Sequence, residues 1–314
     1  MTFTLNDIPD LSGKIAIVTG STAGIGKVSA LELARKNCHV IIACRNQTKG
    51  NAVVKEIQEQ TGNQNVECII LDLTSLASVK QFTTTILTQF DQLHILLNNA
   101  GVLDVPYRLT EDGIESMFAT NHVGHFYLTL ELLPLLIKSG PSRIVNVASM
   151  MHGMTTITGA EFDKMSEEQY FNRKTHYGKT KVANILFTYE LNRRLKAKGI
   201  NNVYVNCNHP GAIKTDPYYE SGFLTKGSLL DSFTSLFFVS PEEGALTQLY
   251  LATSPEIEQN DIKGQYYVPT AKLSSSNGFS KSEENATKLW NVTEKLLEEK
   301  APGGSFHAPV EAKL

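Results

Sequence analysis

The sequence predicts an α/β fold: a doubly wound (Rossmann), mostly parallel seven-stranded sheet with helices on both faces. Short apolar runs of strand length alternate with longer segments of helical pattern, which favours parallel strands joined by helices. The runs are apolar at consecutive positions, as in strands that are buried on both faces. A glycine-rich loop between the first strand and the first helix is typical of the same fold.

Seven apolar runs are long enough for strands, and they stop at residues that can end a strand. The first, Ile-Ala-Ile-Val, stops at Thr19 and Gly20, and the second stops at Arg45. The third stops at Asp72 and the fourth at Asn98. In chain order, the expected strands are residues 15–18, 40–44, 66–71, 95–97, 143–147, 203–208 and 264–268.

Helical periodicity fills the intervals between these strands. A helix is expected over residues 25–36 after the glycine loop, a second one through residue 59, and another over residues 117–133. Because neither a linker nor an internal repeat interrupts the pattern, residues 1–300 are expected to form a single dinucleotide-binding and catalytic domain. Residues 301–314 are rich in proline and glycine and are expected to form a flexible tail.

Two connections are too long for simple turns. Residues 150–174 follow the fifth strand, and residues 216–239 follow the sixth. Both lie beyond the carboxyl ends of strands, where such sheets bind ligands. The second is rich in Phe, Leu and Tyr, so we predict that it forms a substrate lid over an apolar pocket. The alternative is that these apolar residues only pack the segment onto the sheet.

Composition and charge narrow the classes of partner. The chain has 314 residues, a net charge of −3 and a pI near 6.3, so no basic surplus favours nucleic acid as a partner. The four cysteines and eight histidines show no metal-ligand spacing, and no metal is expected. Disulfides are not expected in a chain with so few cysteines.

Targeting signals are sparse in the sequence. No segment approaches the roughly 20 apolar residues that cross a bilayer. Residues 1–13 have the pattern of neither a signal peptide nor an anchor. We therefore expect a soluble intracellular protein. It would be cytoplasmic, or peroxisomal if Ala312-Lys313-Leu314 acts as the Ser-Lys-Leu address that it resembles.

The glycine loop, Thr19 to Gly26, has the spacing TGxxxGxG. Gly20 permits a tight turn, and Gly24 and Gly26 allow a helix N-terminus to approach a pyrophosphate. The loop departs from GxGxxG because Ser29 stands where the third glycine would fall. The expected cofactor contacts in the loop are Gly20, Ser21, Thr22, Gly24, Ile25 and Gly26.

The end of the second strand predicts the choice of cofactor. NAD-dependent enzymes usually place an acid there to bind the ribose 2′-hydroxyl, but this strand ends in Ala43-Cys44-Arg45-Asn46. The guanidinium of Arg45 suits a phosphate, which favours NADP(H) over NAD(H). The alternative for Arg45 is a solvated charge. For Lys27, which could add positive charge, the phosphate role and a solvated charge are equally favoured.

Tyr177 and Lys181 have the spacing i, i+4, which places them on one face of a helix. A phenol is a poor base at neutral pH, but a nearby ammonium favours the phenolate and brings the phenol toward acid/base catalysis. The alternative is a packed tyrosine beside a surface lysine. Ser149, at the end of the fifth strand, is placed to hold a substrate oxygen. Asn121, in the expected helix 117–133, is placed to anchor a water for proton relay.

Taken together, these motifs resemble the classical short-chain dehydrogenase/reductase family over roughly residues 11–270. The resemblance rests on TGxxxGxG at 19–26, Asp72, NNAG at 98–101, Asn121, Ser149, YxxxK at 177–181 and Pro-Gly at 210–211. It implies that Ser149 polarises the carbonyl, Tyr177 exchanges the proton, Lys181 binds the nicotinamide ribose, and Asn121 completes the relay. The implied cofactor contacts outside the glycine loop are Asp72, Leu73, Asn99, Ala100, Gly101, Tyr177, Lys181, Pro210, Gly211 and Ile213.

Within this family, Gly-Ile-Gly-Lys, Ala-Cys-Arg-Asn and the long gap between Ser149 and Tyr177 are similar to the retinol dehydrogenase-like branch. Many members of that branch carry an N-terminal membrane anchor, whose pattern residues 1–13 lack. The resemblance implies an NADP(H)-dependent oxidoreductase acting on a hydrophobic aldehyde, ketone or alcohol, such as a retinoid- or steroid-like compound. It is compatible with a homodimer or homotetramer. The alternative is a non-catalytic NADP(H)-binding sensor or scaffold.

Overall fold

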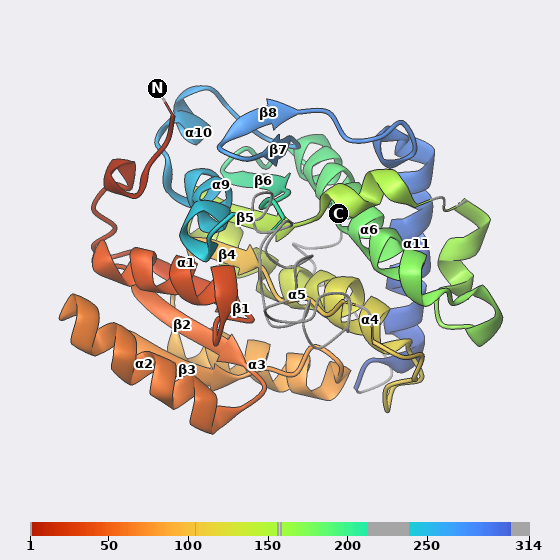
Figure 1. The fold of residues 1–314 in the computed structure, drawn as a ribbon, viewed down its shortest axis with the longest axis horizontal. Coiled ribbons are helices and arrows are strands. Elements are labelled where there is room, and N and C mark those ends of the chain that lie inside the picture. The colour runs from red at the N-terminus through yellow and green to blue at the C-terminus, as the bar shows by residue number, and fades with distance from the viewer. Residues whose placement is uncertain (1, 104, 156, 158, 213–238, 303–314) are drawn as a thin grey trace, which may run out of the picture.

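The computed structural model describes residues 2–103, 105–155, 157, 159–212 and 239–302. The predicted lid falls outside this part of the chain except for Val239, and so does the tail from residue 303 onward with its terminal tripeptide. Within the described residues the chain forms an eight-stranded sheet in the order β3-β2-β1-β4-β5-β6-β7-β8 (Figure 1). The strands are β1 Ile15–Thr19, β2 His39–Cys44, β3 Val66–Ile70, β4 Ile95–Asn98, β5 Ser142–Val147, β6 Val203–Asn208, β7 Tyr266–Val268 and β8 Lys272–Ser274.

The parallel pairing confirms the predicted fold class. Strands β1 to β7 all pair in parallel, and the order reverses between β1 and β4, which is the doubly wound topology. Such a reversal leaves a crevice at the carboxyl ends of the strands on either side of it. The loops that follow β1 and β4 carry the glycine motif and the NNAG motif, so both motifs lie at this crevice.

One strand was not predicted. β8 pairs antiparallel with β7 and forms the edge of the sheet. Its three residues, Lys-Leu-Ser, are all exposed. An exposed strand does not need the apolar run that marks a buried strand in a sequence. β7 also begins two residues later than expected, because Gly264 has a φ of +60° and cannot continue an extended strand.

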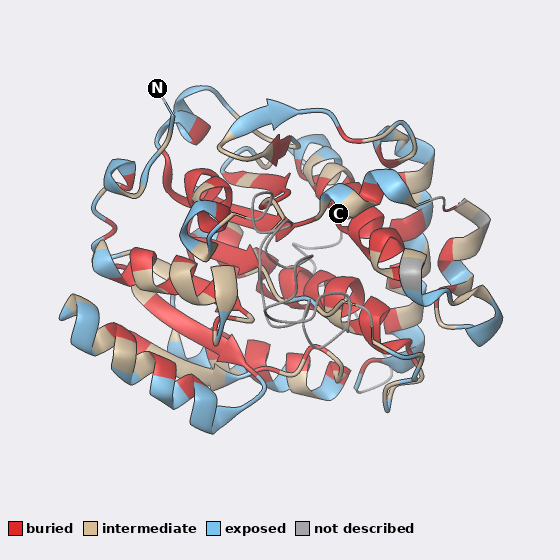
Figure 2. Cartoon of the chain, viewed as in Figure 1, coloured by how far each residue is buried: buried red, intermediate tan, exposed pale blue. Residues whose placement is uncertain are grey.

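Helices cover both faces of the sheet. They are α1 Gly24–Arg35, α2 Gln47–Thr61, α3 Leu76–Gln89, α4 Ser116–Phe118, α5 Gly124–Lys138, α6 Arg173–Ala197, α9 Pro241–Thr253, α10 Glu256–Gln259 and α11 Glu283–Lys300. Apolar residues of α1, α2 and α9 pack on one face, and those of α3, α5 and α6 pack on the other. The sheet between them is largely buried, whereas the outer faces of the helices are exposed (Figure 2).

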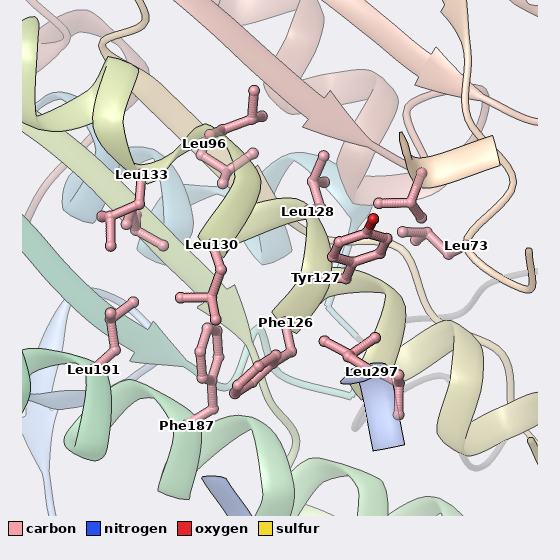
Figure 3. Close-up of a cluster of buried hydrophobic side chains, with 14 of the residues drawn as sticks. Leu73, Leu96, Phe126, Tyr127, Leu128, Leu130, Leu133, Phe187, Leu191 and Leu297 are labelled. Atoms are coloured by element: carbon pink, nitrogen blue, oxygen red, sulfur yellow. The ribbon is translucent and has the colours of Figure 1, made fainter. Parts of the chain in front are cut away.

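The larger core fixes the helices that carry the expected catalytic residues. Phe126 of α5, Phe187 of α6 and Trp290 of α11 are buried, and their rings contact one another. Figure 3 shows Leu130 and Phe126 of α5 facing Phe187 of α6 in this cluster. Each large side chain buried in this way contributes on the order of 2 kcal/mol. Helix α11 thus holds α5 and α6 in place from the outside (Figure 1).

The expected helix 117–133 is divided in the structure. It consists of α4, a short π-helical turn over Ala119–Val123, and α5. Gly124 at the start of α5 lies so close to the loop that follows β3 that a Cβ atom there would be 2.6 Å from the carbonyl oxygen of Leu73. The π-helical turn contains Asn121.

Candidate active site

A cleft with a volume of about 540 Å³ lies at the carboxyl ends of the parallel strands. It is lined by the glycine loop, by the ends of β2 to β6 and by the start of α6. Most of the residues predicted from the sequence meet there. Those that line it are Gly20, Thr22, Gly24, Ile25, Gly26, Arg45, Asp72, Leu73, Asn99, Ala100, Gly101, Ser149, Tyr177, Lys181, Pro210 and Gly211.

Two of the predicted residues do not line the described cleft, and the place of a third is not described. Ser21 is buried, and its hydroxyl donates a 2.8 Å hydrogen bond to the carbonyl oxygen of Val18 at the end of β1. Its side chain therefore stabilises the loop from inside. Asn121 lies behind the cleft wall. Ile213 falls outside the described residues.

The glycine loop packs tightly against the turn that follows β4. Gly20 has a φ of +65°, and a Cβ atom there would lie 2.8 Å from the Cα atom of Ala100. Helix α1 begins at Gly24, and its N-cap residue Ala23 has no side chain that could satisfy the first N–H groups. Unpaired N–H groups at a helix N-terminus attract an anion, so this edge of the cleft suits a pyrophosphate.

The turn after β4 is tied to the end of β1. The backbone N–H groups of Asn99 and Ala100 both donate 2.9 Å hydrogen bonds to the hydroxyl of Thr19. The side-chain amide of Asn99 donates to the carbonyl oxygen of Thr19 at 2.8 Å. These three bonds fix the floor of the cleft, and they show that the side chain of Asn99 holds the loop.

The charged groups near the end of β2 differ in their partners. Arg45 lines the cleft and is exposed, and within the described part of the chain it has no ion-pair partner. Lys27 forms a 2.6 Å ion pair with Glu56 of α2, so its charge is already matched by a carboxylate. Of these two cations, Arg45 is therefore the one available for a phosphate. The carboxylate of Asp72 lines the cleft and accepts bonds from the backbone and hydroxyl of Thr74.

Tyr177 and Lys181 are brought together on α6, as their spacing predicts. The Nζ atom of Lys181 lies 5.4 Å from the centre of the Tyr177 ring. It also donates a 2.9 Å hydrogen bond to the carbonyl oxygen of Val147 at the end of β5. Burial lowers the pKa of Lys181 to about 8, so the amine is cationic at neutral pH and titrates just above it.

Ser149 lies two residues beyond β5, on the same wall of the cleft. Its hydroxyl accepts a 3.2 Å hydrogen bond from the backbone of Met151 and so caps the short helical turn Met150–Met154. His152 donates from Nδ1 to the carbonyl oxygen of Ser149 at 2.7 Å, and its Nε2 accepts from the backbone of Asn277 at 3.3 Å. His152 therefore holds the Ser149 loop in place.

Asn121 connects the π-helical turn to the cleft wall. Its side-chain oxygen accepts from the backbone N–H of Val102 at 2.8 Å, and its amide donates to the carbonyl oxygen of Val102 and to the hydroxyl of Thr180, both at 3.0 Å. The side-chain amide is thus occupied by protein groups.

Sequence reasoning missed three buried polar residues that support these groups, Glu115, His125 and His176, and the supporting role of Thr19 in the glycine motif. Glu115 and His176 form a 2.8 Å pair, and His176 directly precedes Tyr177. The only signal in the sequence is that polar residues stand within apolar helical segments. Among the described residues, no group of three or more His, Cys, Asp or Glu side chains could hold a metal ion. None of the described helices is both long and apolar enough to cross a membrane.

The chain is similar in sequence to known dehydrogenases. The family model described as short chain dehydrogenase matches residues 14–162. The chain is 40% identical to human retinol dehydrogenase 11 over 287 residues, which are 91% of this chain and 86% of that protein. It is 38% identical to the chloroplastic short-chain dehydrogenase TIC 32 A of Brassica napus, over 90% of this chain and 88% of that protein.

Solved structures share the fold. An uncharacterized protein from Mycobacterium paratuberculosis is 30% identical, with a TM-score of 0.75 over 96% of this chain and 100% of that chain. L-sorbose reductase from Gluconobacter frateurii is 21% identical, with a TM-score of 0.67 over 86% of this chain and 100% of that chain.

Proposed function

The chain belongs to the short-chain dehydrogenase family of oxidoreductases, and we propose that it transfers a hydride between NADP(H) and the carbonyl or alcohol group of an apolar substrate. The observation that carries this proposal is the position of the Lys181 amine over the ring of Tyr177, on the wall of a cleft that also contains the glycine loop. A proton-exchanging group and a dinucleotide site at one cleft are what such a transfer requires.

The residues at the cleft fit a dinucleotide. Gly20 and Gly26 let the loop pack closely on itself and on the turn that follows β4, where a Cβ atom at either position would clash. The uncapped start of α1 lies at the same cleft. Gly20, Thr22, Gly24, Ile25 and Gly26 would hold the pyrophosphate. Asp72 and Leu73 would contact the adenosine, and Asn99, Ala100, Gly101, Pro210, Gly211 and Ile213 would contact the rest of the cofactor. When bound, the nicotinamide supplies or accepts the hydride.

Arg45 supports NADP(H) as the cofactor. β2 ends at Cys44 without a carboxylate, and the guanidinium that follows lines the cleft without an ion-pair partner among the described residues. A planar guanidinium can donate two parallel hydrogen bonds to a phosphate, whereas a carboxylate at this place would repel one.

The proton chemistry is assigned to Tyr177. In the reducing direction its phenol donates a proton to the substrate oxygen, and in the oxidising direction the phenolate accepts it. The ammonium of Lys181 stabilises the phenolate, because an opposite charge nearby favours the ionised form. The hydroxyl of Ser149 holds the substrate oxygen and polarises the carbonyl. The carbonyl of Asn121 lies behind these groups, and we assign it the water that links Lys181 to solvent.

The substrate is proposed to be an apolar aldehyde, ketone or alcohol. Val102 and Leu103 line the cleft. Met150 and Met154, the first and last residues of the short helical turn after Ser149, are 52% and 74% exposed. The similarity to retinol dehydrogenase 11 supports a retinoid-like molecule within this class.

A substrate panel tests the proposal. The protein is incubated with NADPH and apolar aldehydes or ketones, or with NADP⁺ and the matching alcohols, and NADPH absorbance is followed. Turnover of at least one apolar substrate, faster with NADP(H) than with NAD(H), is expected. Tight NADPH binding without turnover of any of them would indicate a non-catalytic binding protein and would contradict the proposal.

A further inference from the structure

His125 is a buried histidine that the proposed chemistry does not use. It lies one turn after Asn121 near the start of α5, and only 3% of its surface is exposed. Its Nε2 atom lies 2.9 Å from the hydroxyl of Thr19, and its Nδ1 atom lies 3.2 Å from the main-chain oxygen of Asn121. The imidazole therefore bridges the end of β1 and the π-helical turn.

The position of each proton on this bridge follows from whether the bonded group can donate or accept. A carbonyl oxygen can only accept, so Nδ1 must carry the proton and donate it to Asn121. Burial, and to a smaller extent the nearby charge of Lys181, lower the pKa of His125 to about 3, so the ring is neutral and Nε2 is an acceptor. The hydroxyl of Thr19 then donates to Nε2. Its other acceptor, the carbonyl oxygen of Leu97, is farther away at 3.4 Å.

The bridge runs in one direction from the cofactor turn to the relay residue. The backbone N–H groups of Asn99 and Ala100 donate to Thr19, Thr19 donates to His125, and His125 donates to Asn121. Each donor and acceptor in this series has a partner, which fixes the orientation of every member. The side chain of the relay residue lies near the catalytic amine. A Cβ atom on Gly101 would be 3.4 Å from both the side-chain oxygen of Asn121 and Nζ of Lys181.

We propose that His125 is a positioning residue: it orients the main-chain carbonyl of Asn121 for the proton path to Lys181 and couples that carbonyl to the cofactor turn through Thr19. The inference rests on the proposed function. The side chain of Asn121 is held by Val102 and Thr180. Its main-chain carbonyl, which accepts from His125, has a second lone pair to offer to water. Without the imidazole this carbonyl would lose its side-chain donor.

Two substitutions distinguish the effect of the hydrogen-bond donor on Nδ1 from the effect of the volume of the ring. His125→Leu removes both hydrogen bonds, whereas His125→Asn places an amide N–H near the position of Nδ1 and keeps a donor for Asn121. We expect His125→Leu to lower kcat by about tenfold to a hundredfold, as misplaced catalytic groups do, with KM for NADPH changed by less than about threefold. His125→Asn should recover most of kcat.

His122 is the matched control. It is equally buried and precedes His125 by three residues, but its ring contacts Thr293 of α11 and stacks on Phe118, and it does not line the cleft. His122→Leu should lower Tm while leaving kcat within about twofold of wild type. Equal loss of kcat in His125→Leu and His125→Asn, unchanged kcat in His125→Leu, or a similar loss in His122→Leu would each overturn the proposal.

A second readout does not depend on turnover or on the variants folding. The ¹⁵N chemical shifts of the imidazole nitrogens report the tautomer in the wild-type protein. The proposal requires a neutral His125 ring with its proton on Nδ1 throughout the neutral pH range. A proton on Nε2 would overturn it even if the protein reduces carbonyls, and a proton on Nδ1 would support the bridge even if the substrate panel fails.

Discussion

Lys181 donates a 2.9 Å hydrogen bond to the carbonyl oxygen of Val147, and this bond ties the amine of α6 to the carboxyl end of β5. Because Tyr177 lies on the same face of α6 and Ser149 follows the same strand, the bond links the two elements that bring three proposed catalytic side chains to one cleft. This arrangement buries the Lys181 cation. Burial of a cation destabilises the fold, and this effect on the free energy of unfolding can be measured.

Lys181→Met is expected to yield a more stable but inactive protein. Burial lowers the pKa of Lys181 from 10.5 to about 8, so the charged amine destabilises the fold by up to about 3 kcal/mol at neutral pH. Loss of the bond to Val147 offsets about 1 kcal/mol of this. Denaturant unfolding at pH 7 should therefore show a net gain of about 1–2 kcal/mol.

The pH dependence supplies the check on this prediction. Between pH 8 and 10.5 the unfolded chain binds the lysine proton and the folded chain does not, so wild-type stability rises with pH relative to Lys181→Met. The advantage of the variant should thus disappear at high pH. Lys179→Met serves as the control, because the amine of Lys179 is paired with Glu161 at 3.0 Å. This variant should not be more stable than wild type. A variant at position 181 that is less stable than wild type at pH 7 would count against a costly buried charge.

Arg45→Asp should reverse the cofactor preference. The substitution replaces a phosphate-binding guanidinium by a carboxylate that repels the 2′-phosphate and suits a ribose hydroxyl. We expect the dissociation constant for NADPH to rise by at least about thirtyfold, with that for NADH changed by less than about threefold. Fluorescence titration of both cofactors measures this, with Lys27→Ala as the control because Lys27 is paired with Glu56. Equal changes for the two cofactors would refute the assignment of Arg45.

Gly20→Ala should abolish cofactor binding and destabilise the fold. A Cβ atom at this position would meet the turn that follows β4, 2.8 Å from the Cα atom of Ala100, and the φ of +65° adds strain. Gly62→Ala is the matched control, because Gly62 has a φ of +76° but a Cβ atom there would meet no atom within 4 Å. We expect the free energy of unfolding to fall by about 1 kcal/mol in Gly62→Ala and by at least about 2 kcal/mol in Gly20→Ala. Equal losses of stability would mean that the contact with the turn is unimportant.

Glu115→Gln should destabilise the protein at neutral pH and not at acidic pH. Burial raises the pKa of Glu115, but hydrogen bonds from His176 and from the backbone of Met117 and Phe118 outweigh it and leave the pKa below its usual value. A carboxylate with a depressed pKa stabilises the fold above the unfolded pKa, and this contribution is lost as the pH falls through the folded value.

The expected loss of stability for Glu115→Gln at pH 7 is about 1–3 kcal/mol, since hydrogen bonds to a buried carboxylate are replaced by weaker ones to a neutral amide. The control is Glu67→Gln, which breaks a similar pair with His39 at 2.7 Å, but on the surface with Glu67 41% exposed. That substitution should cost less than about 0.5 kcal/mol. Thermal or denaturant unfolding from pH 3 to 8 measures both, and equal effects would show that burial of the Glu115–His176 pair is irrelevant.

The sequence was sufficient for the fold class and for most of the predicted residues that line the cleft, because both depend on local signals. Apolar runs mark the buried strands, and parallel pairing brings the residues behind them to one edge. β8 escaped prediction because its exposed residues carry no apolar run. Asn121 was predicted correctly as a helical residue, but the π-helical turn around it was not, since that turn depends on the close approach of Gly124 to Leu73.

The supporting residues could not have been predicted in this way. The bond between Thr19 and His125 joins residues 106 positions apart, and the bond between Glu115 and His176 joins residues 61 positions apart. Neither periodicity nor spacing reports such pairs. Ser21 illustrates the converse: its place in the loop motif suggested a cofactor contact, but its side chain turns inward to β1.

The most direct test of the account is single-turnover hydride transfer by Tyr177→Phe with the best apolar substrate of the panel. Removing one hydroxyl leaves the ring and the cleft intact, so NADPH binding should stay within about threefold of wild type. Hydride transfer should fall by about a hundredfold to ten-thousandfold, which is the range that a general acid contributes. Transfer at near wild-type rates in Tyr177→Phe, with cofactor bound, would contradict the central role assigned to this phenol.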